Sequence, residues 1–346
     1  MISPTVPTPR AVTIGEGLAV LVAQPGPLED SESFERTAGG AEANVATVLA
    51  QLNVATGWIS RVGDDGFGRY LVQHLAERGV DVSAVVTDPV RPTGLYLKER
   101  GGGSDATGDL AVGESRMLYY RSGSAASALS PTDLATPAAS TWLNDSALAH
   151  VTGITPALSE SATQLTDTLV SMPRRGRLVS FDLNYRPALW LGRAAAATEV
   201  LERVTRHSDV VFMGADEALA VFGTDDPAEL RAMFGEPEHL IVKNDAHTVT
   251  GFHGRERVDV PALRLAVVEK IGAGDAFAGG FLAGLLHGLG HEERIRLGHL
   301  CAAAALTGHG DIAQLPPLHR LEELLEVDEA DWARLQVASE LAERIS

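Results

Sequence analysis

The sequence has almost no cysteine and no long apolar stretch, and each shortage excludes a class of protein. Cys301 is the only cysteine among 346 residues, which excludes an internal disulfide and a cysteine-cluster metal site. No apolar run approaches the roughly 18 residues that a membrane-spanning helix needs. Residues 1–10 lack both the charged start and the apolar core of a signal peptide. We therefore expect a cytoplasmic protein that does not enter a membrane.

Positive charge is also in short supply. Lysine and arginine number 28 against 46 aspartate and glutamate residues, which gives a net charge of −18. This balance argues against nucleic acid or an anionic membrane surface as a partner. The hydrophobic content of 45% fits a folded globular protein, and the length allows one large domain with a smaller addition.

Segments with strand character alternate with segments that have helical periodicity, which predicts an α/β layered fold. The predicted core strands are Ala11–Gly15, Thr56–Arg61, Ala147–Val151, Arg177–Asp182, Asp209–Met213, Leu240–Lys243 and Val249–Phe252. The predicted helices include Gly68–Arg78, Glu160–Ser171, Ala215–Phe222, Glu292–Leu306 and Ala330–Glu343. Two stretches, 18–37 and 93–122, have strand character but break the alternation, so they do not all fit a central parallel sheet.

The most informative segment is residues 271–281, Ile-Gly-Ala-Gly-Asp-Ala-Phe-Ala-Gly-Gly-Phe. Three small residues precede Asp275, and a helical run follows. A helix start offers unpaired N–H groups and a positive partial charge, which suits an anion. Asp275 then supplies a carboxylate that can accept a proton beside the bound anion. The simpler alternative is an aspartate that caps a helix after a glycine turn.

A second glycine-containing segment lies upstream, where Gly39 and Gly40 open the helical run that contains Asn44. The glycine pair suits either the close approach of a polyhydroxylated ligand or tight packing of helix on sheet. Asn44 offers a donor and an acceptor to hydroxyl groups. Together with Gly63-Asp64-Asp65-Gly66-Phe67-Gly68 and residues 271–281, this pattern resembles the ribokinase/PfkB family of carbohydrate kinases over roughly residues 10–320.

The resemblance implies a ribokinase-like three-layer α/β/α sandwich with a mostly parallel central sheet and a small β-sheet lid. The lid would be formed by the segments at about 18–37 and 93–122, inserted in a kinase domain of residues 10–320. Residues 321–346 would form a C-terminal helical extension. Lids of this family often pair, so a homo-oligomer is expected, with a dimer through the lid as one form.

The resemblance also implies ATP as phosphoryl donor and Mg²⁺ as its companion. Asp275 would be the general base, and the backbone of Gly272, Ala273 and Gly274 would form the anion hole. Glu217 falls where the family has Asn-x-x-Glu, a motif that affects Mg²⁺ and phosphate, although Gly214 replaces the asparagine. The alternative is that Glu217 only stabilises a helix start.

Nucleotide contacts are predicted from Lys243, Asn244, Gly272, Gly274 and His309. The family's glycine-containing nucleotide loop appears here as Lys243-Asn244-Asp245-Ala246-His247-Thr248, without either glycine, so its contacts must differ. His309 either contacts the base or is a turn residue. The family's Asp-Thr pair before the Gly-Ala-Gly-Asp motif, part of a monovalent-cation site in some members, is replaced by Glu269-Lys270.

The substrate is indicated by arginines set among aromatic and small residues in an acidic protein. Arg121 follows Tyr119-Tyr120, and Arg186 follows Asn184-Tyr185. A guanidinium matches a carboxylate with a planar pair of donors, although each arginine could equally pair with a carboxylate of the protein. Both segments resemble those of the 2-keto-3-deoxygluconate kinases of this family. That resemblance implies a substrate site formed by Gly39, Gly40, Asn44, Tyr96, Tyr119, Arg121 and Arg186.

The sequence thus predicts ATP-dependent phosphorylation of the terminal primary hydroxyl of a sugar acid, with 2-keto-3-deoxygluconate as the first candidate. The alternatives are a kinase for a neutral sugar such as fructose or ribose, a kinase for another keto-deoxy acid, and a sugar-binding regulator without turnover. An intact Asp275 speaks against the regulator, since a binding protein needs no base there.

Overall fold

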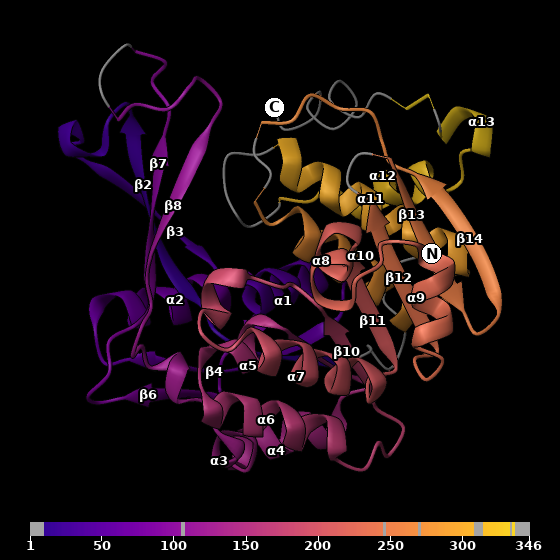
Figure 1. The fold of residues 1–346 in the computed structure, drawn as a ribbon, viewed down its shortest axis with the longest axis horizontal. Helices are drawn as coiled ribbons and strands as arrows, with labels where there is room; N and C mark the ends of the chain where they lie inside the picture. The colour runs from indigo at the N-terminus through magenta and orange to yellow at the C-terminus, as the bar shows by residue number, and fades with distance from the viewer. Residues whose placement is uncertain are drawn as a thin grey trace.

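The main feature of the molecule is a ten-stranded sheet with helices on both faces (Figure 1). The structure is a computed structural model, and it describes residues 10–104, 108–244, 247–268, 271–307, 314–332 and 334–335. The strand order is β14-β13-β12-β11-β10-β9-β1-β4-β5, with β6 paired to β4. The pairs from β12 through β11, β10, β9 and β1 to β4 are parallel, while β13 and β14 add an antiparallel edge.

The bounds of these strands are β1 Arg10–Ile14, β4 Ala55–Gly63, β5 Val80–Asp81, β6 Val85–Asp88, β9 Leu148–Thr152, β10 Leu178–Asp182, β11 Val210–Gly214, β12 His239–Asn244, β13 Thr248–His253 and β14 Glu256–Pro261. The helices are α1 Ala41–Gln51, α2 Gly66–Ala76, α3 Pro131–Leu134, α4 Pro137–Asp145, α5 Ile154–Leu158, α6 Glu160–Ser171, α7 Ala194–Arg206, α8 Ala215–Phe222, α9 Pro227–Met233, α10 Ala273–Leu286, α11 His291–Thr307, α12 Leu318–Leu325 and α13 Glu329–Trp332.

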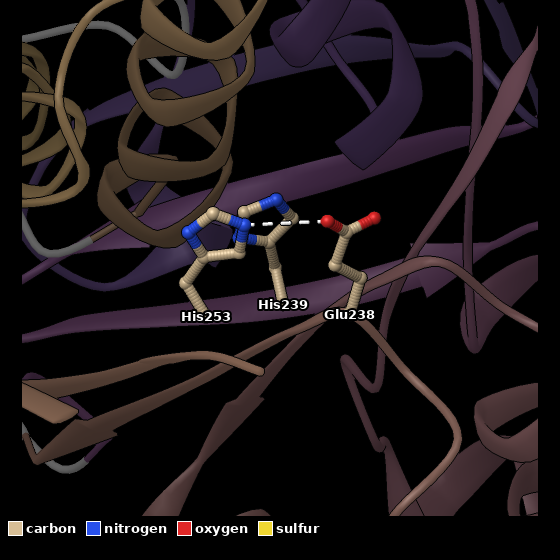
Figure 2. A group of neighbouring side chains, drawn as sticks. All are labelled: Glu238, His239 and His253. Carbon is tan, nitrogen blue, oxygen red and sulfur yellow. Dashed lines mark hydrogen bonds and ion pairs between the residues drawn. The ribbon is translucent and has the colours of Figure 1, made fainter. Parts of the chain in front are cut away.

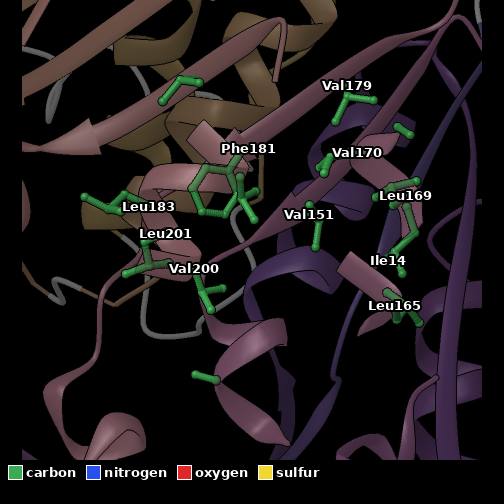
Figure 3. Packing of buried hydrophobic residues seen from close by; sticks show 14 of the residues in the cluster. Ile14, Val151, Leu165, Leu169, Val170, Val179, Phe181, Leu183, Val200 and Leu201 are labelled. Atoms are coloured by element: carbon green, nitrogen blue, oxygen red, sulfur yellow. The ribbon is translucent and has the colours of Figure 1, made fainter. Parts of the chain in front are cut away.

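Both faces of the central strands are apolar because each face packs against helices. Along β11, Val211 and Met213 join the core under α4, α6 and α7, while Val210 and Phe212 join the core under α1, α10 and α11. Side chains of a strand alternate between the two faces, so one strand supplies both cores. Figure 3 shows the first core, with Phe181 of β10 among the side chains of α6 and α7. The three-layer sandwich expected from the sequence is confirmed.

Helix α10 lies unusually close to its two neighbours. A Cβ on Gly279 would come within 2.7 Å of Val48 on α1, and a Cβ on Gly280 within 2.8 Å of Cys301 Sγ on α11. The glycines therefore set the spacing of these helices, because any larger residue would push them apart. This packing brings the first turns of α1 and α10 together at the same end of the sheet.

The two stretches that break the alternation form a separate four-stranded sheet of order β3-β2-β7-β8. Its strands are β2 Leu18–Pro25, β3 Phe34–Gly39, β7 Leu95–Arg100 and β8 Ser115–Tyr120. Figure 1 shows this sheet standing away from the helical layers, with β2, β3, β7 and β8 side by side. The predicted lid is confirmed as a mixed sheet, since β2 and β7 are parallel and the two outer pairs are antiparallel.

Most predicted elements are present within a few residues. Helices α6 and α8 have the predicted bounds, and the two predicted ends of α11 differ by one residue each. Strand β14, Glu256–Pro261, was not expected. A helix was predicted at 330–343. The structure has α13 at Glu329–Trp332, and most of residues 333–343 lie outside the described residues. Within the described ranges, no helix is both long and apolar enough to cross a bilayer.

A buried histidine on β9 predicts loss of stability in acid. His150 is fully buried, with Nδ1 3.0 Å from Ser180 Oγ, and burial lowers its pKa from 6.5 to about 4. The unfolded chain binds this proton more readily, so the contribution of His150 to stability is complete above pH 6.5 and declines below it. We expect the free energy of unfolding to fall by about 2 kcal/mol from this residue between pH 6.5 and 5.

The measurement is urea unfolding of the wild type and of His150→Asn at pH 7 and pH 5. The variant should lose less stability on acidification than the wild type. An equal loss in the two proteins would assign the acid sensitivity to other groups.

Candidate active site

Several predicted site residues lie with two others, Asp182 and Gly214, at the carboxyl ends of the parallel strands. Asp182 ends β10, Gly214 ends β11, and Lys243 lies one residue before the end of β12. The first turns of α1 and α10 meet the same edge, carrying Asn44 and Asp275. This edge is the usual ligand-binding side of an open α/β sheet because the strand ends and helix starts leave polar groups there.

Asp275 is held by two side-chain amides. Asn44 Nδ2 donates a 2.8 Å hydrogen bond to one carboxylate oxygen, and Asn184 Nδ2 donates a 3.3 Å hydrogen bond to the other. The Oδ1 atoms of Asn44 and Asn184 are buried and have no hydrogen-bond partner among the described residues. A buried amide oxygen without a donor is costly, so a ligand with hydroxyl groups would complete the arrangement.

The environment favours Asp275 as a base. Burial and the negative charge of Asp182 raise the pKa of Asp275, while the hydrogen bond from Asn44 and the positive charges of Arg186 and Lys243 oppose the rise. A carboxyl whose pKa lies above its usual value is better matched to accepting a proton near neutral pH.

The start of α10 has features that suit an anion. Gly272 precedes the helix with φ = 78°, a left-handed conformation that glycine adopts without strain. The N–H groups of the first turn, which includes Ala273 and Gly274, have no acceptor within the helix. The Nζ atom of Lys243 lies 3.6 Å from the position that a Cβ of Gly274 would take. A helix terminus and an ammonium group therefore face the same space.

A network of buried charges surrounds this space. Lys243 Nζ lies 2.8 Å from Asp182 Oδ2, and both side chains are largely buried. Burial alone would lower the pKa of Lys243, but Asp182 and Glu217 raise it, so the ammonium stays charged. Burial and repulsion from Asp182 raise the pKa of Glu217, against the effects of Lys243 and Arg186.

Glu217 stabilises a helix start, which was one of the two alternatives left open by the sequence. Its Oε2 accepts a 3.1 Å hydrogen bond from the Gly214 N–H at the start of α8, as a helix-capping carboxylate does. Its Oε1 lies 2.9 Å from Arg186 Nη1, and its side chain is 16% exposed. The carboxylate thus caps the helix and also faces the charged network, and its role toward a metal stays a prediction.

The two arginines differ in their surroundings. Arg186 is half exposed, and within the described structure its hydrogen bonds, to Glu217 and to the Tyr185 carbonyl, use only Nη1. Arg121 is largely buried and forms an ion pair with the fully buried carboxylate of Glu16, which also accepts a 2.8 Å hydrogen bond from Ser124 Oγ. The pairing favours a structural role for Arg121, at the junction of β1 and the lid, over contact with a substrate carboxylate.

The lid contributes the two predicted tyrosines. Tyr96 on β7 and Tyr119 on β8 lie opposite each other, with ring centroids 5.1 Å apart. Tyr96 is 3% exposed, whereas Tyr119 is 54% exposed. The Oη of Tyr96 has no hydrogen-bond partner in the described structure. Their contact with a substrate stays a prediction.

The glycine pair before α1 has a structural explanation. Gly40 has φ = 121°, and a Cβ there would come within 2.3 Å of the Glu16 carbonyl oxygen. Packing alone therefore requires glycine at position 40, and ligand contact by Gly39 and Gly40 remains a prediction.

The nucleotide loop is described in part. Asn244 is exposed at the end of β12, where its carbonyl accepts a 2.9 Å hydrogen bond from the His247 N–H. Asp245, Ala246, Glu269, Lys270 and His309 lie outside the described residues. The predicted roles of Asn244 and His309 toward a nucleotide therefore stay predictions.

Glu42 is a buried residue that the sequence pattern did not indicate. Its Oε1 accepts hydrogen bonds from the Thr152 N–H at 3.0 Å, Thr152 Oγ1 at 2.8 Å and Thr155 Oγ1 at 2.7 Å. Burial raises its pKa to about 7, against these hydrogen bonds. A Cβ on Gly15 would lie 2.1 Å from the Glu42 carboxyl carbon. The carboxyl thus ties the start of α1 to the end of β9 and positions Asn44 two residues later.

Three carboxylates of this region, Glu16, Glu42 and Asp182, were not singled out from the sequence. Asp182 and Glu16 stand at or just after strand ends, a position that could have indicated them. Glu42 carries no comparable signal, because a glutamate in the first turn of a helix is ordinarily exposed.

Comparison with known proteins gives a consistent result. Residues 10–318 match the family described as pfkB family carbohydrate kinase. A 2-dehydro-3-deoxygluconokinase of Thermoproteus tenax is 36% identical over 319 residues, covering 91% of this chain and 94% of that protein. A 2-dehydro-3-deoxygluconokinase of Bacillus subtilis is 32% identical over 327 residues, covering 91% and 95%.

A solved structure shares the architecture. The crystal structure of an uncharacterized sugar kinase from Pyrococcus horikoshii in complex with ATP superposes with a TM-score of 0.76 at 25% identity. The alignment covers 93% of this chain and 99% of that one.

Proposed function

The chain belongs to the pfkB family of carbohydrate kinases, and we propose that it transfers the γ-phosphoryl group of ATP to the terminal primary hydroxyl of 2-keto-3-deoxygluconate. The product would be the 6-phosphate. The names of the two relatives support the substrate, and the ATP complex of the Pyrococcus horikoshii kinase supports the donor.

The observation that carries the proposal is the setting of Asp275. The carboxylate is oriented by the amides of Asn44 and Asn184, and it lies in the first turn of α10. The unpartnered amide oxygens suit the hydroxyl groups of a sugar, and the helix start suits a phosphate. A base, hydroxyl acceptors and an anion site next to one another are what phosphorylation of an alcohol requires.

In the proposed reaction, Asp275 accepts the proton of the terminal hydroxyl while the oxygen of that hydroxyl forms a bond to the γ-phosphorus of ATP. The bond between the γ-phosphorus and the bridging oxygen breaks, and ADP leaves with that oxygen. The N–H groups at the start of α10 and the Lys243 ammonium stabilise the charge on the transferring group.

Mg²⁺ fits the donor set of this region. Glu217 and Asp182 offer carboxylate oxygens, the ligand type that Mg²⁺ prefers, and these two residues would hold the ion. Bound there with ATP, Mg²⁺ would neutralise part of the phosphate charge.

The preference for a sugar acid depends on Arg186. Its side chain is half exposed, uses only Nη1 in its hydrogen bonds within the described structure, and is close enough to Asp275 to influence that residue's pKa. The remaining N–H groups are available to a carboxylate.

The proposal is tested by measuring ADP release with Mg-ATP and a panel of acceptors. The panel holds 2-keto-3-deoxygluconate, its galacto isomer, fructose and ribose. We expect the highest kcat/KM for one of the two keto-deoxy acids. A higher value for a neutral sugar would replace the sugar acid in the proposal, and no turnover with any acceptor would favour a binding protein.

Replacement of Arg186 tests the carboxylate contact. Arg186→Ala should lower kcat/KM for the sugar acid by roughly 10- to 100-fold, because a charge-assisted hydrogen bond contributes about 1.5–3 kcal/mol. Activity on a neutral analogue, with an alcohol in place of the acid, should fall far less. The measurement is the ratio of the two kcat/KM values in wild type and variant.

Arg121→Ala is the matched control. It leaves the buried Glu16 carboxylate without its ion-pair partner, so it should lower the melting temperature and depress activity on both substrates together. If Arg186→Ala left the ratio unchanged and raised only the KM for ATP, Arg186 would serve the nucleotide instead.

We also propose a cytoplasmic location and a dimer formed through the lid. The lid sheet ends in two edge strands, β3 and β8, and exposes Phe34, Tyr119 and Tyr120. Apolar side chains on an unpaired edge favour association with a second copy.

A further inference from the structure

A cluster of metal-ligating side chains lies at the opposite end of β12 from the candidate active site. His239 opens β12, and Lys243 stands four residues later, a separation of about 13 Å along a strand. Beside His239 lie His253, from the end of β13, and Glu238, from the loop before β12. We propose that Glu238, His239 and His253 form a binding site for Zn²⁺ or a similar borderline divalent transition metal.

The sheet brings the two histidines together. His239 and His253 are directly opposed partners in the antiparallel β12–β13 pair, so their side chains project from the same face. The imidazole rings lie 4.5 Å apart, centroid to centroid. The Glu238 carbonyl accepts a 2.8 Å hydrogen bond from the Gly254 N–H, which fixes Glu238 beside His253.

The spacing of the polar atoms suits a small metal ion. Glu238 Oε1 and His253 Nε2 are 3.2 Å apart, and Figure 2 shows this pair beside the ring of His239. One ligand atom from each residue lies within 4.8 Å of the other two. Zinc bonds of about 2.0–2.2 Å in tetrahedral geometry place two ligand atoms about 3.4 Å apart. The Glu238–His253 pair is close to this spacing. Small rotations about side-chain bonds would bring a ring nitrogen of His239 to a similar distance from both.

A second observation points to a missing partner. His239 is 3% exposed, and its Nδ1 is buried without a hydrogen-bond partner among the described residues. A bound metal ion would give this nitrogen the partner that the described residues do not supply.

The donor set decides the class of metal. Two imidazoles and one carboxylate are typical of zinc sites, whereas Mg²⁺ prefers oxygen ligands alone. The site would thus differ in selectivity from the carboxylates near Asp275. Three protein ligands leave a fourth position for water.

The cluster has neighbours of both charge signs, so their electrostatic effects on a bound cation partly cancel. Arg294 of α11 brings a positive charge near His239 and Glu238, and Glu256 at the start of β14 brings a negative charge near His291. His291 of α11 also faces the pair, with ring centroids 6.0 Å from His239 and 5.8 Å from His253. A bound metal would link the β12–β13 pair and stabilise this edge of the fold.

The test is calorimetric titration of the full chain with Zn²⁺, after removal of metals by a chelator and its dialysis. Excess Mg²⁺ is present to occupy sites with oxygen ligands only. We expect one Zn²⁺ per chain and a melting temperature that rises by roughly 3 °C or more at saturation. Co²⁺ in place of Zn²⁺ should give the visible absorption of a four-coordinate ion with nitrogen ligands.

Two variants and a control locate the ion. Glu238→Gln and His253→Gln, both at partly exposed side chains, should each weaken Zn²⁺ binding at least about tenfold. His207→Gln removes an exposed histidine of the surface after α7 and should leave binding unchanged. The proposal is overturned if the wild type binds no stoichiometric Zn²⁺, if both cluster variants bind it as the wild type does, or if the control loses binding equally.

Discussion

Asp275→Asn should lower turnover by roughly 10²- to 10⁴-fold, because it removes the base and keeps the size of the side chain. The fold should tolerate the change. The new amide would meet an N–H group of Asn44 or Asn184, but each of these has an unpartnered oxygen that a flip of its own amide would bring into place. The measurement is steady-state kcat with the sugar acid and Mg-ATP, together with the affinity of the variant for both substrates.

The matched control is Asp216→Asn, the same substitution at an exposed carboxylate in the first turn of α8. It should retain turnover. If the Asp275 variant kept more than about a tenth of the wild-type kcat, proton transfer to Asp275 would not be part of the rate-limiting chemistry and the assignment of the base would be wrong.

Lys243→Met should affect both activity and stability. The methionine fills similar space but removes the ammonium that faces the start of α10, for which we expect a loss of roughly 10²- to 10³-fold in kcat/KM. It also leaves the Asp182 carboxylate, 3% exposed, without its partner at 2.8 Å. An uncompensated buried charge of this kind costs about 3–5 kcal/mol of stability.

A double variant separates the two effects. Asp182→Asn combined with Lys243→Met removes both charges, so the free energy of unfolding should recover most of its loss. Turnover should stay low, since the ammonium is still missing. Recovery of turnover along with stability would mean that Lys243 acts only by neutralising Asp182.

The sequence was sufficient for seven of the ten strands of the central sheet, because the central strands are buried on both faces. A strand of this kind is a short apolar run, as in β11 and β12, which were both predicted. Strand β14, Glu-Arg-Val-Asp-Val-Pro, was missed because it lies at the edge of the sheet, where four of its six residues are charged or proline. Pattern rules favour a loop for such a segment.

Parts of the site could be predicted where the backbone conformation itself requires glycine. Gly40 and Gly272 have positive φ, which favours glycine, and they mark the two helix starts that bring Asn44 to Asp275. The partners of the charged side chains were not predictable. The pairing of Arg121 with Glu16 and of Lys243 with Asp182 depends on three-dimensional distances, and the choice between a substrate and a protein carboxylate is decided only there.

The close contact of α1 with α10 also determines when the protein can become active during its synthesis. The hydrogen bond between Asn44 and Asp275 joins residues 231 positions apart, so it cannot form until residue 275 has been synthesised. Until then Val45, Val48 and Leu49 of α1 lack the helix that buries them. A nascent chain must therefore carry an uncovered apolar surface from the synthesis of α1 until that of α10, and in that interval aggregation or chaperone binding competes with folding.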